Sequence, residues 1–169
     1  MSQRFGDNTP VVKVELKRAD AAELIASKVE LSGAPLVKAL AGAMSTLLPR
    51  STLRRYPDKV VLMQQGEEGD SLFFVMAGDV RLFARRDKDS AELGVVHLGG
   101  VLGESEVLAG EGGRRCSAVA QGQVDVLEFP RAALLVGGKL PPPLVAMLEN
   151  VKSGRMKALD EMSDFLNRW

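Results

Sequence analysis

The sequence has 169 residues, of which 46% are hydrophobic and 26% are charged, as expected of one globular domain with its own core. Basic and acidic residues both total 22, so the chain has no net charge to attract nucleic acid or anionic lipid. One cysteine and one histidine exclude an intrachain disulfide and multi-ligand zinc sites, and we expect no enzyme. Without a signal peptide or an apolar run of about 18 residues, we expect a cytoplasmic protein with no membrane span.

The N-terminal third predicts a lead-in followed by a strand and helices. Residues 1–10 contain Gly, Asp, Asn and Pro and predict a flexible segment. Residues 11–50 form the next unit, in which VVKVEL (11–16) predicts a short strand. Apolar residues at helical spacing predict one helix at 19–29 and another at 34–48, capped by Ser32 and ended by Pro49.

The middle of the chain, residues 51–130, predicts an antiparallel β-barrel or jelly roll. Short runs rich in Val, Leu and Phe alternate with turn signals every 8–12 residues, which is typical of such folds. These runs are KVVLMQQ, SLFFVMAG, DVRLFARR, ELGVVHL, RCSAVAQ and QVDVLEFP. GEEGDS (66–71) and AGD (77–79) predict turns between them. His97 ends one apolar run and is interpreted as a structural histidine.

Residues 131–169 predict helices. RAALLVGG is interpreted as a short helix closed by Gly137 and Gly138, and residues 140–169 as a long helix with prolines in its first turn. Its apolar residues follow an almost heptad spacing that is broken at Arg155. This helix could pack on its own barrel, or act as a lid or as a dimer seam. The fold class is therefore α+β, a barrel between N-terminal helices and a long C-terminal helix.

The stretch VLGESEVLAGEGGRRCSAVA (101–120) has the chemistry of an anion site. A short helix beginning near Gly103 would point free N–H groups and its positive dipole end at an anion. Two arginines, Arg114 and Arg115, follow a glycine-rich loop. Cys116 is interpreted as a packed residue rather than as a reactive thiol.

This stretch, together with QQGEEGDSLFFVMAGDVRLF (64–83), resembles the cyclic nucleotide-binding domain family over residues 35–168. The resemblance implies that Glu104 accepts a hydrogen bond from the ribose hydroxyl and that Arg115 neutralises the cyclic phosphate. Phe165 or Trp169 would cap the base. The expected ligand is cAMP or cGMP, with no other cofactor and no metal. The expected ligand-binding residues are Gly103, Glu104, Ser105, Arg114, Arg115, Cys116 and Ser117.

The stretch departs from the family pattern in a shorter turn before Gly103, in Arg114 where a proline is common, and in Glu106. A carboxylate within about 6 Å of a bound phosphate opposes it by about 1–3 kcal/mol. Glu106 either points outward and pairs with Arg114, which leaves Arg115 for phosphate, or pairs with Arg115 and fills the phosphate site itself.

Two functions follow as hypotheses. The first is a regulatory module that binds a cyclic nucleotide and transmits occupancy through its C-terminal helix to an unidentified protein partner. The alternative is a domain that has lost nucleotide binding and serves protein–protein contacts. A homodimer through residues 143–168 is predicted, and nucleic acid binding is not expected, because no helix-turn-helix segment follows the long helix.

Overall fold

The fold is seen in a computed structural model that describes residues 14–15, 31, 33–40 and 43–167. The predicted lead-in at 1–10, the helix at 19–29, the cap at Ser32 and the side chain of Trp169 lie outside the described residues, as does the side chain of Phe165. None of the described helices is long and apolar enough to cross a membrane.

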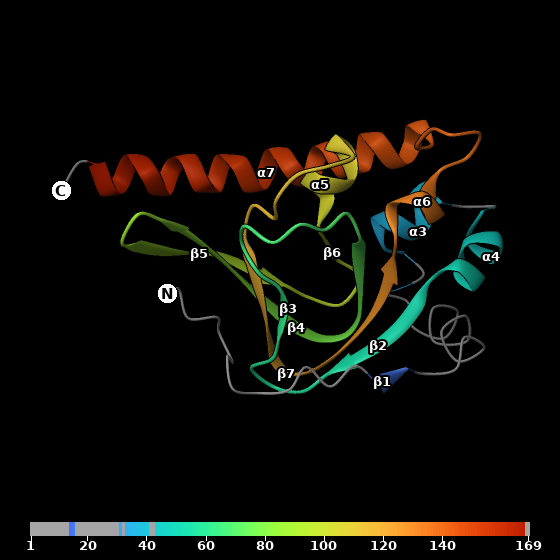
Figure 1. The fold of residues 1–169 in the computed structure, drawn as a ribbon, viewed down its shortest axis with the longest axis horizontal. Coiled ribbons are helices and arrows are strands. Elements are labelled where there is room, and N and C mark those ends of the chain that lie inside the picture. The colour runs from blue at the N-terminus through green and yellow to red at the C-terminus, as the bar shows by residue number, and fades with distance from the viewer. Residues whose placement is uncertain (1–13, 16–30, 32, 41–42, 168–169) are drawn as a thin grey trace.

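The strands form one antiparallel sheet that curls into a jelly-roll barrel (Figure 1). Its hydrogen-bonded path is β1-β2-β7-β4-β5, with β3 also pairing with β7 and β6 with β4. The strands are β1 (Val14–Glu15), β2 (Thr52–Tyr56), β3 (Val61–Met63), β4 (Leu72–Arg86), β5 (Asp89–Val96), β6 (Val101–Leu102) and β7 (Ser117–Phe129). The predicted fold class is confirmed.

The helices lie along one side and one end of the barrel (Figure 1). They are α3 (Pro35–Ala39), α4 (Met44–Leu47), the 3-10 helix η1 (Leu48–Arg50), α5 (Glu104–Ala109), α6 (Arg131–Leu134) and α7 (Pro142–Asn167). The long helix α7 crosses the whole molecule, packs on α3 and α5, and passes over β5. The predicted short and long C-terminal helices are therefore confirmed. The closure of the short helix by Gly137 and Gly138 is wrong, because α6 ends at Leu134 and both glycines lie in the turn between Val136 and Lys139.

The sheet has an apolar core on each of its two faces. Because successive side chains of a strand point to opposite faces, Phe73 faces the barrel interior and its neighbour Phe74 faces the helices. The interior core also holds Tyr56, Val75 and Leu82, all buried. The outer core joins the sheet to leucines of α3, α6 and α7, so these helices are held to the barrel by burial of apolar surface.

The prediction of one helix over 34–48 is wrong. Leu40 ends α3 with φ −102° and ψ 16°, and a separate α4 follows, so the apolar residues reach the core from two short helices. Pro49 lies inside η1, which directly follows the end of α4 at Leu47.

The predicted turn at AGD (77–79) is also wrong, because β4 continues through it. The register with β7 shifts on both sides of Ala77, which marks a bulge. Gly78 has φ +84°, and a Cβ there would lie 2.3 Å from the carbonyl oxygen of Gln123. Glycine at this position therefore serves a bulged long strand. β7 likewise continues through Gly122 where two strands were predicted.

Candidate functional site

The candidate site is the stretch 101–120, which we call the cassette, and it is built around α5, the cassette helix. Its N-cap is Gly103 with φ +90°, and a Cβ at that position would lie 2.5 Å from the carbonyl oxygen of Ser71. Only glycine fits this entry into the helix without strain. The predicted helix start is thus confirmed. The next three residues, Glu104, Ser105 and Glu106, are all buried.

Glu106 forms an ion pair with Arg114 inside the protein. The distance from Arg114 Nη1 to Glu106 Oε1 is 3.1 Å, and the two side chains are only 5% and 4% exposed. Arg114 Nη1 also donates to the carbonyl oxygen of Ser71 at 3.1 Å, and the guanidinium lies 5.5 Å from the ring centre of Phe73. The expectation that a Glu106–Arg114 pair would point outward is therefore wrong.

Space for the buried guanidinium comes from glycines. A Cβ at Gly69 would lie 2.9 Å from Arg114 Nε, and one at Gly103 would lie 2.8 Å from Arg114 Nη1. The two glycines come from the turn before β4 and from the N-cap of α5. The GEEGDS turn and the cassette therefore both contribute to the space that holds the side chain of Arg114.

Burial raises the pKa of the Glu106 carboxyl above its ordinary value. The hydrogen bond and charge of Arg114 act in the opposite direction, and the charge of Glu104 adds to the rise. Two carboxylates in the first turn of α5 thus lie near one another in a dry environment. Each depends on an arginine from elsewhere in the chain.

Glu104 forms an ion pair with Arg155 of α7. Arg155 Nη1 donates to Glu104 Oε2, and Arg155 Nη2 donates to the carbonyl oxygen of Val101. The Glu104 side chain is 7% exposed and that of Arg155 is 21% exposed. This contact ties the long helix to the cassette. Arg155 was not among the predicted site residues, although it breaks the apolar spacing of α7, and that break was the available signal.

The remaining predicted site residues have different surroundings. Arg115 is exposed, and its Nη1 lies 3.4 Å from the sulfur of Met156 on α7. Cys116 is packed in the interior core, where burial and then the charge of Glu104 raise the pKa of its thiol to about 12. Ser117 is buried, and its hydroxyl accepts a hydrogen bond from the backbone N–H of Gln65 at 2.9 Å. The interpretation of Cys116 as a packed residue agrees with this burial.

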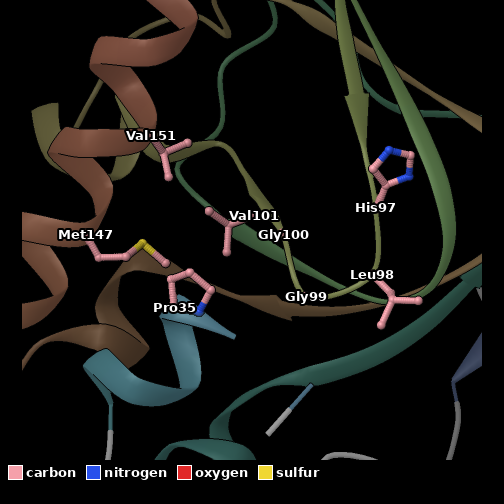
Figure 2. Close-up of a pocket in the computed structure, with 8 residues that line it drawn as sticks. All are labelled: Pro35, His97, Leu98, Gly99, Gly100, Val101, Met147 and Val151. Carbon is pink, nitrogen blue, oxygen red and sulfur yellow. The ribbon is translucent and has the colours of Figure 1, made fainter. Parts of the chain in front are cut away.

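Two hollows lie near these residues. A polar one of about 620 Å³ opens beside the cassette loop, lined by Glu68, Gly69, Asp70, Gly110, Glu111 and Gly112. A second, apolar hollow of about 310 Å³ lies under α7 (Figure 2). There Met147 and Val151 face Pro35 and Val101, with glycines of the β5–β6 turn beside them. The apolar hollow has few polar groups that could orient a nucleotide.

His97 lies at the far side of the apolar hollow from α7 (Figure 2). It is exposed, and its Nδ1 lies 2.7 Å from Asp79 Oδ1. Within the described parts of the chain, no group of three or more His, Cys, Asp and Glu side chains could hold a metal ion.

The structure combines a jelly-roll barrel, a short helix with two carboxylates at its start, an arginine-bearing loop and a long covering helix. Together these features define a regulatory type of small-ligand domain. Residues 53–136 match the profile of the cyclic nucleotide-binding domain. Through these residues the chain belongs to the cyclic nucleotide-binding domain family, which confirms the resemblance inferred from the sequence.

Solved structures agree with this assignment. The Catabolite Activator Protein of Thermus thermophilus has 29% identity and a TM-score of 0.65, over 79% of this chain and 63% of that one. A PKAR CBD2 structure with bound Sp-2Cl-cAMPS has 20% identity and a TM-score of 0.65, over 85% and 93% of the two chains. The regulatory subunit of a cAMP-independent protein kinase A from Trypanosoma brucei has 18% identity and a TM-score of 0.66, over 80% and 46%.

The chain thus spans 63% of the length of the Thermus protein. No curated protein sequence matches it significantly.

Proposed function

We propose that the chain is a regulatory module in which a cyclic nucleotide, cAMP or cGMP, enters the cassette and changes the position of α7. The observation that carries the proposal is the contact of Arg155 on α7 with Glu104 on α5. A ribose hydroxyl would use the same carboxylate that Arg155 now uses. Ligand and helix therefore compete for one acceptor, so ligand binding favours a state with α7 released.

The phosphate of such a ligand would meet the exposed Arg115. Because Arg114 is already paired with Glu106, Arg115 is the cassette arginine better placed to neutralise an incoming charge. Gly103 and Ser105 would offer backbone N–H groups, while Cys116 and Ser117 would line the barrel side. In the proposed state Arg115 leaves the sulfur of Met156, so a second contact of α7 also changes on binding.

The experiment is a calorimetric titration of the purified chain with cAMP and with cGMP. We expect saturable binding by at least one of them, and loss of at least tenfold in affinity in Arg115→Ala and Glu104→Gln. Glu149→Gln is the matched control, because Glu149 is an exposed carboxylate that lines neither hollow. Absence of heat and of a melting shift at about 5 mM ligand would rule the proposal out.

Movement of α7 is measured separately with two spin labels. Ser153 on α7 and Ser90 on β5 are exposed and can be replaced by cysteine with little change in volume. The native Cys116 is buried with a raised thiol pKa, so it should not compete for the label. We expect the distance distribution to shift when ligand is added, and an unchanged distribution with bound ligand would refute the transmission through α7.

The protein partner stays unidentified, and the homodimer through residues 143–168 remains our proposal. The apolar residues of α7 before Arg155 face the protein, since Leu144 and Leu148 are fully buried in its outer core. Light scattering at tens of micromolar is the test, and a monomer mass would refute the dimer.

The second candidate function is an interaction module that takes no nucleotide. It is favoured by the buried Glu106–Arg114 pair, in which the charge of Arg114 is already neutralised by a carboxylate of the same chain. The same fold occurs in the cAMP-independent kinase regulatory subunit of Trypanosoma brucei. Micromolar binding of cAMP or cGMP that is lost in Arg115→Ala would decide against this candidate.

A further inference from the structure

The apolar hollow under α7 shares only Val101 with the cassette. Its volume is about 310 Å³, and its lining comes from α3, from the β5–β6 turn with the start of β6, and from α7. In Figure 2 the side chains of Met147 and Val151 point toward Pro35 and Val101, so apolar groups face this space from two sides. An apolar cavity of about 150 Å³ is enough to bind benzene, so the hollow has room for a molecule of about two fused rings.

One wall of the hollow is nearly bare backbone, because Gly99 and Gly100 form it. Gly99 has φ +88°, and a Cβ at Gly100 would lie 2.6 Å from Cγ1 of Val96, so a side chain is disfavoured at both positions. The N–H of Gly99 donates to the carbonyl oxygen of Val75, and the N–H of Gly100 donates to that of His97. The carbonyl oxygen of Gly100 accepts from the N–H of Val75. A flat apolar molecule can therefore lie against this wall without covering these groups unpaired.

The lining disfavours a charged ligand. Among the described residues that line the hollow, none is Lys, Arg, Asp or Glu. His97 is ionisable, but its side chain is 73% exposed and its Nδ1 lies 2.7 Å from Asp79 Oδ1, so a carboxylate already balances it when it is protonated. A carboxylate or phosphate in the hollow would lose hydration without gaining a cation of its own.

Exposed apolar side chains gather at the same turn. In the part of the chain that the structure describes, three large apolar side chains are exposed, and two of them are Val95 and Leu98, at 38% and 37%. Leu98 lines the hollow, and Val95 lies near the end of β5 just before it. Exposed apolar surface beside an apolar hollow is typical of a binding site, because a ligand there removes that surface from water.

A ligand in the hollow would contact α7, because Met147 and Val151 both belong to this helix. Val101, on the barrel side, is already tied to α7, since its carbonyl oxygen accepts a hydrogen bond from Arg155. A ligand that touches α7 and the β5–β6 turn together makes both sets of contacts only while α7 lies on the barrel. Its binding therefore stabilises that position of the helix.

We propose that this hollow is a second ligand site, which takes a small uncharged aromatic molecule and holds α7 against the barrel. An aromatic ring suits the lining because the glycine wall is flat and because the thioether of Met147 is flexible and makes favourable contacts with rings. The site differs from the cassette in its residues and in the class of its ligand. It does not depend on whether a nucleotide enters the cassette.

The test is a titration of the purified chain with indole, an uncharged molecule of two fused rings, followed by NMR of the methionine methyl groups. We expect the Met147 signal to shift saturably, with a dissociation constant below about 2 mM. Met63 and Met76 are buried and do not line the hollow, so their signals should shift little. No shift of Met147 at about 5 mM indole, or a saturable shift at Met156 beside the cassette arginine in its place, would overturn the site.

A charged probe tests the class of ligand. Indole-3-acetate has the same two rings and adds a carboxylate, for which the lining has no free cation. We expect it to shift the Met147 signal with an affinity at least tenfold weaker than that of indole. Equal affinities for the two probes would contradict the preference for an uncharged ligand.

Substitutions test the place of binding. Val151→Trp fills the hollow from α7 and should abolish the shift of Met147, whereas Val145→Trp is the control on the same helix, half-buried but outside the lining. Leu98→Ser changes an exposed lining residue, so it should leave the fold intact and weaken indole binding at least threefold. Unchanged affinity in Leu98→Ser, or in folded Val151→Trp, would overturn the assignment to this hollow.

The hold on α7 is measured by amide exchange of the wild type with and without indole. At about five times the dissociation constant, we expect exchange in α7 between residues 145 and 155 to slow at least threefold, with no change in β7. Binding of indole that leaves exchange in α7 unchanged would overturn the hold on the helix. Because no nucleotide is present, these results neither require nor test the proposed function of the cassette.

Discussion

The two ion pairs of the cassette differ in what they hold together. Glu106 and Arg114 join α5 to the loop before β7, and both side chains are buried. Glu104 and Arg155 join α5 to the distant helix α7, and Arg155 is 21% exposed. The first pair lies within the barrel unit, and the second links that unit to a helix lying across it (Figure 1).

This difference separates the stability of the barrel from the attachment of α7 to it. Breaking a buried pair by removal of one partner leaves an uncompensated charge, which is far more costly than loss of a contact that water can replace. The Glu106–Arg114 pair should therefore govern whether the domain folds, and the Glu104–Arg155 pair should govern where α7 lies. The predictions below test that division.

The largest expected effect is that of Arg114→Ala. Removal of the guanidinium leaves Glu106 buried without its cation and should lower the free energy of unfolding by about 3–5 kcal/mol. Urea denaturation measures this loss. Arg115→Ala, at the exposed neighbouring position, is the control and should change the free energy by less than about 0.5 kcal/mol. Equal losses in the two variants would contradict the burial argument.

The next effect is that of Gly103→Ala, which disturbs the first pair through the backbone. The added Cβ would need a positive φ and would approach both the Ser71 carbonyl oxygen and Arg114. We expect a loss of about 2–3 kcal/mol in unfolding free energy. Gly122→Ala is the control, because Gly122 has a positive φ but open space around it, and should lose about 1 kcal/mol.

A smaller global effect is expected for Arg155→Ala, since only the link to α7 is lost. The free energy of unfolding should fall by about 1–2 kcal/mol, while amide exchange in α7 beyond residue 152 should accelerate at least tenfold. Lys157→Ala, exposed on the same helix, should change neither quantity. Faster exchange throughout the barrel would show instead that the second pair supports the whole fold.

The smallest effect is the pH dependence of the first pair. Because the pKa of Glu106 is raised in the folded protein, the folded state holds this proton more tightly than the unfolded state. The stability of the wild type relative to Glu106→Gln should be greatest below the ordinary value of 4.5 and should fall as pH rises through the raised pKa. Denaturation at several pH values should show this relative loss, and a relative gain would contradict the sign.

Local patterns were enough to predict much of the fold. The cassette helix, the last two helices and the antiparallel barrel follow from residue spacing and from Gly103 at a helix start. Where the prediction of strands failed, glycines were the cause. Gly78 was interpreted as a turn residue, and two strands were predicted on either side of Gly122, yet both glycines lie inside long strands. A glycine at positive φ serves a bulge as well as a turn, and pairing between distant strands decides which.

The site was predicted less completely for the same kind of reason. The choice of Arg114 as the partner of Glu106 depends on Gly69 and Ser71, which lie more than 40 residues away in the chain. The pairing of Arg155 with Glu104 depends on how α7 crosses α5. Sequence spacing indicates which residues carry charge, but packing between distant elements decides their partners.

The long ladder between β4 and β7 has a consequence for how the protein folds. It pairs Phe83 with Ser117 at one end and Leu72 with Phe129 at the other, so the cassette lies in the loop that the ladder closes. Such non-local pairing is slow to form. The buried charges at Glu106 and Arg114 can lose water only after that closure. In stopped-flow measurements we therefore expect Arg114→Ala to unfold faster than the wild type and to fold at a nearly unchanged rate.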